Sequence, residues 1–252
     1  MVNKNNKINK VYKQLSILIS QDGFFFYLHH SETEYSKDLE SILVKDVLDV
    51  KSLKIFQKQL KQISHHYDFK SIKVAFANSY YTLVPKDYYK EELKSDYLKY
   101  NVQLFEEDHI SSDYIQEIDV YHIYIPLMNY HNVILDLVDE FEYHHFTNNL
   151  IKYSKPKIFD VQQRLHVFMT KSSLDIVAFE GQKFRLCNSF AYETDYDLAY
   201  YILFAIEELK FDQRKMQLNI THNFEETPWL DILKIYILNV NCEQKALASF
   251  VK

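Results

Sequence analysis

The first residues of this chain that could do chemistry lie in a short turn near the N-terminus. LSILISQDGFFFYLHH, residues 15 to 30, places Gln21-Asp22-Gly23 between two apolar runs. Asp-Gly between such runs predicts a β-hairpin, because both residues tolerate a positive φ. The Asp22 carboxylate could hold a metal ion or a water molecule in phosphoryl transfer. It could also be a turn residue that bonds its own backbone, and we favour this structural interpretation.

A second polar turn, Thr170-Lys171-Ser172-Ser173, separates two further apolar runs. Lys171, Ser172 and Ser173 could bind an anion through an ammonium group and two hydroxyls. A polar hairpin turn of this composition is also ordinary, and we favour that interpretation here too. We therefore expect no catalytic residue and no bound cofactor, and we keep Asp22, Gly23 and these three residues as ligand candidates only if the protein is active.

The glycine content argues against the usual nucleotide-binding loops. The 252 residues include only two glycines, Gly23 and Gly181, so the chain has no GxGxxG and no GxxxxGK[ST] motif. Glycine lets backbone N–H groups approach phosphates closely. The sequence therefore lacks the loops with which most nucleotide-binding proteins hold phosphate.

Other reactive side chains give weaker indications. Three His-His pairs, at residues 29–30, 65–66 and 144–145, could bind metal at a surface, but adjacent residues point in different directions on a strand or a helix. We expect no metal site. Cys187 is expected to be a small buried residue rather than a nucleophile, since a catalytic thiol needs a nearby base.

A helix expected from Thr194 to Leu209 carries the candidates for an interaction surface. Thr194 suits the N-cap position, and acids in the first turn complement the helix dipole. Tyr200 and Tyr201 face different directions, so one is expected in the core and the other in a groove or against a partner. We therefore name Asp197, Tyr200 and Tyr201 as interaction candidates, together with the segment around residues 88–100.

Composition limits the classes of function. Apolar residues make up 47% of the chain, and the formal net charge is −6. A negative charge without a basic patch gives no support to nucleic-acid binding, and no apolar stretch is long enough to predict membrane insertion. Two cysteines and a polar start without a signal sequence predict a cytoplasmic protein.

The order of expected elements repeats along the chain. Apolar periodicity predicts an α/β protein with mixed sheets, in which the order β-β-β-α-β-α occurs twice. We expect a first half at residues 11–155, with an insertion at about 80–125, and a second, shorter half at 156–252. The second half is expected to end with a helix at 227–240, where Pro228 suits the first helical position.

Three stretches resemble a known family. LSILISQDGFFF, YTLVP and NSFAYETDYDLAYYILFAIEEL are similar to an uncharacterised family of Bacteroidota proteins described as having an actin-like ATPase (ASKHA) fold. The resemblance covers nearly the whole chain, and it implies two ribonuclease-H-like units, each beginning with a β-hairpin. Most of its specificity lies in seven residues of the second half: Asn188, Ser189, Phe190, Tyr192, Asp197, Tyr200 and Tyr201.

The resemblance also implies where ATP would bind. The fold's ATPases use an Asp-x-Gly-type hairpin in each half and a glycine-rich adenosine loop after a late strand. Here Asp22 and Gly23 are adjacent rather than spaced, the second turn has neither Asp nor Gly, and Thr221-His222-Asn223-Phe224 stands where the loop's glycines would be.

Two hypotheses follow from these departures. The first is a non-catalytic scaffold or protein-interaction module, a pseudo-ATPase whose partner is an unknown protein or a second copy of itself. The alternative is an enzyme of the same superfamily that binds ATP or another phosphate ligand through unusual contacts.

Overall fold

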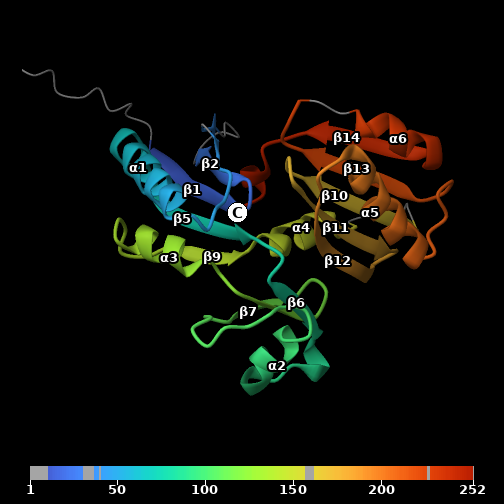
Figure 1. Ribbon diagram of the computed structural model, residues 1–252, viewed down its shortest axis with the longest axis horizontal. Coiled ribbons are helices and arrows are strands. Elements are labelled where there is room, and N and C mark those ends of the chain that lie inside the picture. Colours follow the sequence, from blue (N-terminus) through green and yellow to red (C-terminus); the bar gives the residue numbers. More distant parts are fainter. Residues whose placement is uncertain (1–10, 31–36, 40, 157–161, 226–227, 252) are drawn as a thin grey trace, which may run out of the picture.

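The computed structural model describes residues 11–30, 37–39, 41–156, 162–225 and 228–251 (Figure 1). In this part of the chain the strands form two larger sheets and one small sheet. Figure 1 shows the two larger sheets on opposite sides of the molecule, with helix α4 between them. The small sheet projects from the first half, together with helix α2.

The first sheet has the order β3-β2-β1-β5-β9, and β4 also pairs with β2. Strands β1 and β2 form the expected antiparallel hairpin, while β5 and β9 add in parallel. The third strand of the expected order is divided into two very short strands, β3 and β4. The strands of this sheet are β1 (Val11–Ser20), β2 (Gly23–His30), β3 (Lys37–Asp38), β4 (Ile42–Leu43), β5 (Asp68–Ala77) and β9 (Glu142–His145).

The second sheet repeats this topology, in the order β12-β11-β10-β13-β14. An antiparallel hairpin, β10–β11, is again followed by two parallel strands, so the duplicated α/β order is confirmed. The division at residues 155 and 156 stays a prediction, and residues 157–161 lie outside the described part. The strands are β10 (Gln163–Met169), β11 (Ser173–Glu180), β12 (Lys183–Ala191), β13 (Gln217–His222) and β14 (Asn239–Gln244).

The end of the second half differs from the expectation. The last helix, α6 (Trp229–Tyr236), is shorter than expected, and Pro228 is its N-cap residue. Strand β14 follows and pairs with β13, so the second sheet has a counterpart of β9 and is not cut short. Alternating Val240 and Cys242 pack on the core while polar residues stand between them, and this pattern suits an edge strand.

Helices cover the outer face of each large sheet. Helix α1 (Val50–His66) buries Phe56, Leu60 and Ile63 against the first sheet, beside α3 (Met128–Leu135). Helix α5 (Asp195–Glu208) and α6 cover the second sheet in the same way. The predicted N-cap is confirmed, because Thr194 and Asp197 form a capping box at the start of α5.

The insertion forms the small sheet, in the order β6-β8-β7. Its strands are β6 (Tyr81–Pro85), β7 (Ser111–Ile115) and β8 (Val120–Tyr124). The segment between β6 and β7 contains two short 3₁₀ turns, at Lys86–Tyr88 and Glu91–Leu93, followed by α2 (Lys94–Leu98). The Tyr97 hydroxyl donates to the Tyr88 carbonyl at 2.6 Å, which folds this segment back on itself instead of extending it as a helix.

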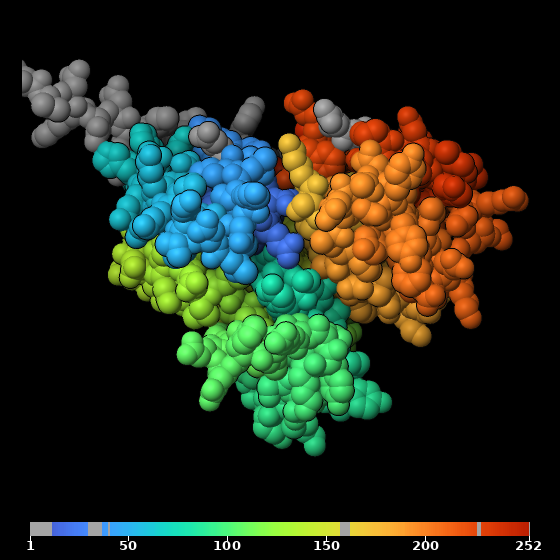
Figure 2. Space-filling view, viewed as in Figure 1, coloured from blue at the N-terminus to red at the C-terminus, as the bar shows by residue number. Residues whose placement is uncertain are grey.

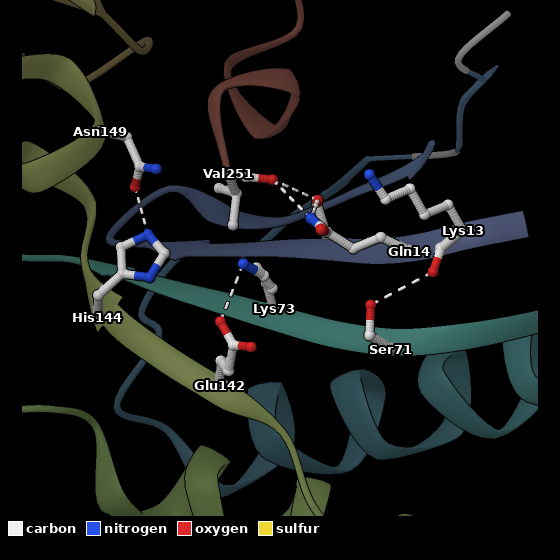
Figure 3. Close-up of polar contacts among 9 residues, drawn as sticks. Lys13, Gln14, Ser71, Lys73, Glu142, His144, Asn149 and Val251 are labelled. Carbon is white, nitrogen blue, oxygen red and sulfur yellow. Dashed lines mark hydrogen bonds and ion pairs between the residues drawn. The ribbon is translucent and has the colours of Figure 1, made fainter. Parts of the chain in front are cut away.

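The inner faces of the two large sheets share one core. Helix α4 (Phe146–Ser154) contributes Phe146, Leu150 and Ile151, which pack with side chains of both sheets. A 3₁₀ turn at Leu247–Phe250 returns the chain to the first sheet. There the Val251 carbonyl accepts hydrogen bonds from Gln14 Nε2 at 2.9 Å and from Ser16 Oγ at 2.5 Å (Figure 3).

The fold requires glycine at position 23, but not because the hairpin turn needs a residue that tolerates positive φ. A primed turn would need positive φ at its central residues, Gln21 and Asp22. In the described part the only non-glycine residues with positive φ are Asp119 and Lys210, so the turn is not of the primed type. Gly23 instead begins β2 with a φ of +147°, and an added Cβ would collide with the Ile42 carbonyl of β4. The glycine therefore permits the close approach of β4.

Replacing Gly23 with Ala should destabilise the protein by about 3 kcal/mol, because backbone atoms of β4 would have to move. Gly181→Ala is the matched control. Gly181 also has a positive φ, +55°, but nothing lies within 4 Å of its added Cβ, so we expect a loss of about 1 kcal/mol. Urea unfolding of the two variants measures both values, and equal losses would contradict the close approach.

Candidate functional site

The two hairpin turns that could hold phosphate are in direct contact. The Asp22 carboxylate accepts a hydrogen bond from the Ser172 backbone N–H at 3.3 Å and a very short one from the Ser172 hydroxyl. These residues are 150 positions apart, so the contact joins the first sheet to the second. The structure thus brings two of the ligand candidates, Asp22 and Ser172, together, and they are hydrogen-bonded to each other.

Gly23 and Ser173 take other roles at these turns. Gly23 is buried beneath β4 and pairs with Leu43. The Ser173 hydroxyl bonds Thr170 Oγ1 at 2.8 Å within its own turn. The backbone N–H groups of Ser172 and Ser173 donate to Asp22 and Thr170 Oγ1 respectively, so both donors are already engaged within the chain.

A cavity of about 620 Å³ lies on one side of the Asp22–Ser172 contact, and we call it the cleft cavity. Figure 2 shows the furrow between the blue and orange parts of the chain in which the two halves meet. Lys171 is the one lysine among the residues that line the cleft cavity, and it is exposed. Four acidic residues line it as well: Asp22, Glu193, Asp195 and Glu225. The excess of carboxylates makes this cavity unfavourable for a polyanion.

Aromatic side chains fill the end of strand β13, where an adenosine loop would stand. The His222 ring lies 5.8 Å from the Trp229 ring, and its Nδ1 is 2.7 Å from the Phe224 carbonyl oxygen. Trp229 is buried at the wall of the cleft cavity, and its indole N–H has no hydrogen-bond partner among the described residues.

A partly buried polar network that sequence reasoning missed lies deeper between the halves. The Ser189 hydroxyl donates to Asp175 Oδ1 at 2.5 Å and lies 3.0 Å from the Tyr81 hydroxyl of the insertion. Tyr81 also lies 3.7 Å from the sulfur of Cys187. The signal that could have found Asp175 is its position: it alternates with Val177 and Phe179 on the strand face that packs against α4.

Burial sets the protonation of this network. It raises the pKa of the Asp175 carboxyl to about 6 and that of the Cys187 thiol to about 12. Cys187, which is half-buried, is therefore a thiol and not a thiolate at neutral pH. The adjoining cavity, lined by Ser173, Asp175 and Ser189, holds about 50 Å³, which is room for a few water molecules but not for a substrate.

Two buried histidines extend the network into the small sheet. His122 and His145 lie 4.6 Å apart between ring centroids, and each ring lies 4.8 Å from the Tyr81 ring. Burial lowers the pKa of His122 to about 4 and that of His145 well below its ordinary value. Both are neutral at pH 7, and they act as hydrogen-bonding groups toward Asn148, Thr147 and the Asn78 carbonyl.

The histidines whose side chains the structure describes do not assemble a metal centre. His144 and His145 point to opposite sides of β9, toward Asn149 and Asn78 respectively. The described residues include no group of three or more His, Cys, Asp and Glu side chains that could hold a metal ion. The side chain of His30 lies outside the described part.

The interaction candidates on α5 fall into two groups. Asp197 caps its own helix, and Tyr201 stacks on Phe190 with ring centroids 4.6 Å apart, so both have structural roles. Tyr200 is 60% exposed and stacks with Phe204, and Tyr196, one turn earlier, is 77% exposed. Tyr196, Tyr200 and Phe204 recur every four residues and form one aromatic stripe, which we call the α5 face. In the insertion, Tyr88 and Tyr100 are also exposed.

Among the helices of the described ranges, none combines the length and the apolar character that crossing a membrane requires.

Comparison with solved structures identifies the fold. A protein from Bacteroides thetaiotaomicron, described as having an actin-like ATPase fold and unknown function, matches with a TM-score of 0.81 at 21% identity and covers 98% of each chain. A structure of the PilM-PilN type IV pilus biogenesis complex matches with a TM-score of 0.60 at 11% identity, over 95% of this chain and 90% of the other.

A third solved structure has a similar fold. The ethanolamine utilization protein EutJ from Carboxydothermus hydrogenoformans matches with a TM-score of 0.54 at 8% identity, over 98% of this chain and 89% of that one. No curated protein matches the sequence. At these identities the likeness establishes the actin-like ATPase fold alone.

A family model described as protein of unknown function (DUF3822) matches residues 2–240. The match spans both large sheets and the insertion, so it covers the cleft and the buried network together. The chain therefore belongs to the DUF3822 family, and it has the actin-like ATPase fold.

Proposed function

We propose that the protein is a non-catalytic interaction module, a pseudo-ATPase built on the actin-like ATPase fold. The observation that carries the proposal is the direct contact between Asp22 and Ser172. A phosphate bound between the two turns would have to replace that contact. It would also have to lie beside a carboxylate that is already hydrogen-bonded, with no glycine loop to offset the repulsion.

The charge of the cleft cavity supports the same conclusion. Phosphoryl-transfer sites surround their phosphates with cations, backbone N–H groups and metal ions. Here one exposed lysine stands against four carboxylates. Two or three carboxylates together could favour a divalent cation, but the described residues form no cluster of metal ligands.

The alternative, an enzyme that binds ATP or another phosphate ligand, rests on two observations. The cleft cavity has the volume of a typical small-molecule site, and Trp229 offers it an indole N–H without a partner. A nucleotide base could use that donor. The phosphates, however, would then extend toward Asp22, so the alternative requires the Asp22–Ser172 contact to open.

The α5 face is the proposed interaction surface, and the partner is an unknown protein or a second copy of the chain. Exposed aromatic side chains at helical spacing are typical of interface hot spots. Similarity to the PilM-PilN complex supports this function class, because the fold there is found in a protein–protein complex. Two free cysteines agree with the cytoplasm as the proposed location.

Calorimetry with ATP and Mg²⁺ tests whether the cleft cavity binds a nucleotide. We expect no dissociation constant tighter than about 0.1 mM, since each tenfold gain in affinity requires about 1.4 kcal/mol that the missing loops do not supply. Lys171→Met is the control, because it removes the one lysine among the residues that line the cleft cavity. A tighter constant that is lost in this variant would contradict the proposal and establish the alternative.

A double-mutant cycle measures the contact itself. Asp22→Ala and Ser172→Ala should each lower the free energy of unfolding by about 1 kcal/mol, because each removes charge-assisted hydrogen bonds at a part-buried site. The double variant should lose less than the sum, with a coupling of about 1 kcal/mol. Strictly additive losses would show that the two turns are not joined in solution.

The α5 face is tested by comparing variants of the protein, each used as the bait in a binding experiment. Tyr200→Ser and Phe204→Ser change exposed side chains, so the fold should be retained while a partner or self-association is lost. Light scattering reports self-association, and affinity purification from the native cell reports a partner. Leu135→Ser, an exposed apolar change on α3, is the control. Equal binding by all three variants would contradict the proposed surface.

A further inference from the structure

A second cavity, of about 570 Å³, lies away from the cleft, and we call it the β9–α4 cavity. Strands β5 and β9 form one wall, α4 and the C-terminal 3₁₀ turn form another, and β7 of the insertion closes it. Its volume lies in the range of small-molecule sites, which is about 300–1,000 Å³. Its lining differs from that of the cleft cavity in the sign of its charge.

Three lysines and two carboxylates line the β9–α4 cavity. Both carboxylates already have partners. Glu142 pairs with Lys73 at 2.9 Å between the neighbouring strands β9 and β5 (Figure 3). Asp113 accepts a hydrogen bond from Asn148 Nδ2 at 2.8 Å, and burial raises the pKa of its carboxyl. With three lysines and two carboxylates, the lining carries one positive charge in excess, and Lys152 is near enough to Asp113 for its charge to lower the pKa of that carboxyl.

The two remaining lysines stand where a ligand could reach them. Lys152 lies on the exposed side of α4 and makes no ion pair or hydrogen bond with any residue in the described ranges. The Lys245 ammonium lies 4.6 Å from the centre of the Phe250 ring and 5.3 Å from that of Tyr153, and both rings line the cavity. These rings hold the cation at the wall without neutralising it.

Polar groups without a charge complete the lining. Ser249 lines the cavity and is 8% exposed, and its hydroxyl is buried with no partner among the described residues. His144 is turned toward Asn149 (Figure 3). Burial, together with the nearby Lys152 and Lys73 charges, lowers the pKa of His144 to about 4. The histidine therefore leaves the local charge to the lysines at neutral pH.

We propose that the β9–α4 cavity binds a small organic anion through Lys152 and Lys245, with the Ser249 hydroxyl as a further donor. The chemical class is a molecule with a carboxylate or phosphate group that is small enough for the cavity. The protein as a whole carries a net charge of −6, whereas the lining of this cavity has more lysines than carboxylates.

Thermal shift and calorimetry with two probes, inorganic phosphate and succinate, test the proposal and separate the two anion types. We expect at least one probe to raise the melting temperature above a sodium chloride control of equal ionic strength. Lys152→Met should weaken its binding at least about tenfold, as expected when a charged hydrogen bond is lost. Lys152 is exposed, so this variant should fold normally.

Lys171→Met is the matched control, because its lysine lines the cleft cavity instead. It should leave binding of the probe unchanged. No binding of either probe at about 10 mM, or binding that Lys152→Met leaves intact, would overturn the proposal. Binding lost only in Lys171→Met would place the anion in the cleft and overturn it as well. None of these outcomes depends on the α5 face.

Discussion

Helix α4 is buried between the two large sheets, and the positions of the other parts depend on this packing. Its apolar side chains, Phe146, Leu150 and Ile151, contact the inner faces of both sheets, which would otherwise expose Phe25, Phe168 and Phe179 to water. Burying such side chains stabilises the fold by roughly 1.5–3 kcal/mol each. Its polar residues, Thr147 and Asn148, bond the histidines of the network. One short helix therefore holds the two halves and the insertion together.

The packing of α4 also explains why the two hairpin turns meet. With both inner faces pressed on one helix, the turns at the ends of β1–β2 and β10–β11 lie opposite each other. In a nucleotide-binding protein a ligand would fill the space between such turns. Here a carboxylate and a serine fill it, and the space that remains is divided into separate cavities on either side.

Local patterns predicted much of this architecture, because hairpins and helix caps are encoded within a few residues. LSILISQDGFFF showed the first hairpin, and Thr194 showed the start of α5. Strand β14 was missed because Asn239–Gln244 is polar and pairs on one edge only. The contact between Asp22 and Ser172 could not be found from spacing, since it joins residues 150 apart that meet only when both sheets pack on α4.

The distribution of charge between the two cavities follows from these constraints. A carboxylate can persist at the closed turns because Ser172 donates two hydrogen bonds to it, and that local negative charge disfavours anions in the adjoining cleft. On the far side of the first sheet the carboxylates are neutralised by Lys73 or hydrogen-bonded by Asn148, and Lys152 keeps its charge. A buried charge is stable only beside a partner of opposite charge or beside water. The lysines that line a polar cavity can reach water there, so they need no buried acid to stabilise them. The fold therefore places an excess of lysines at the cavity that α4 and the C-terminal segment build, and an excess of carboxylates at the cleft.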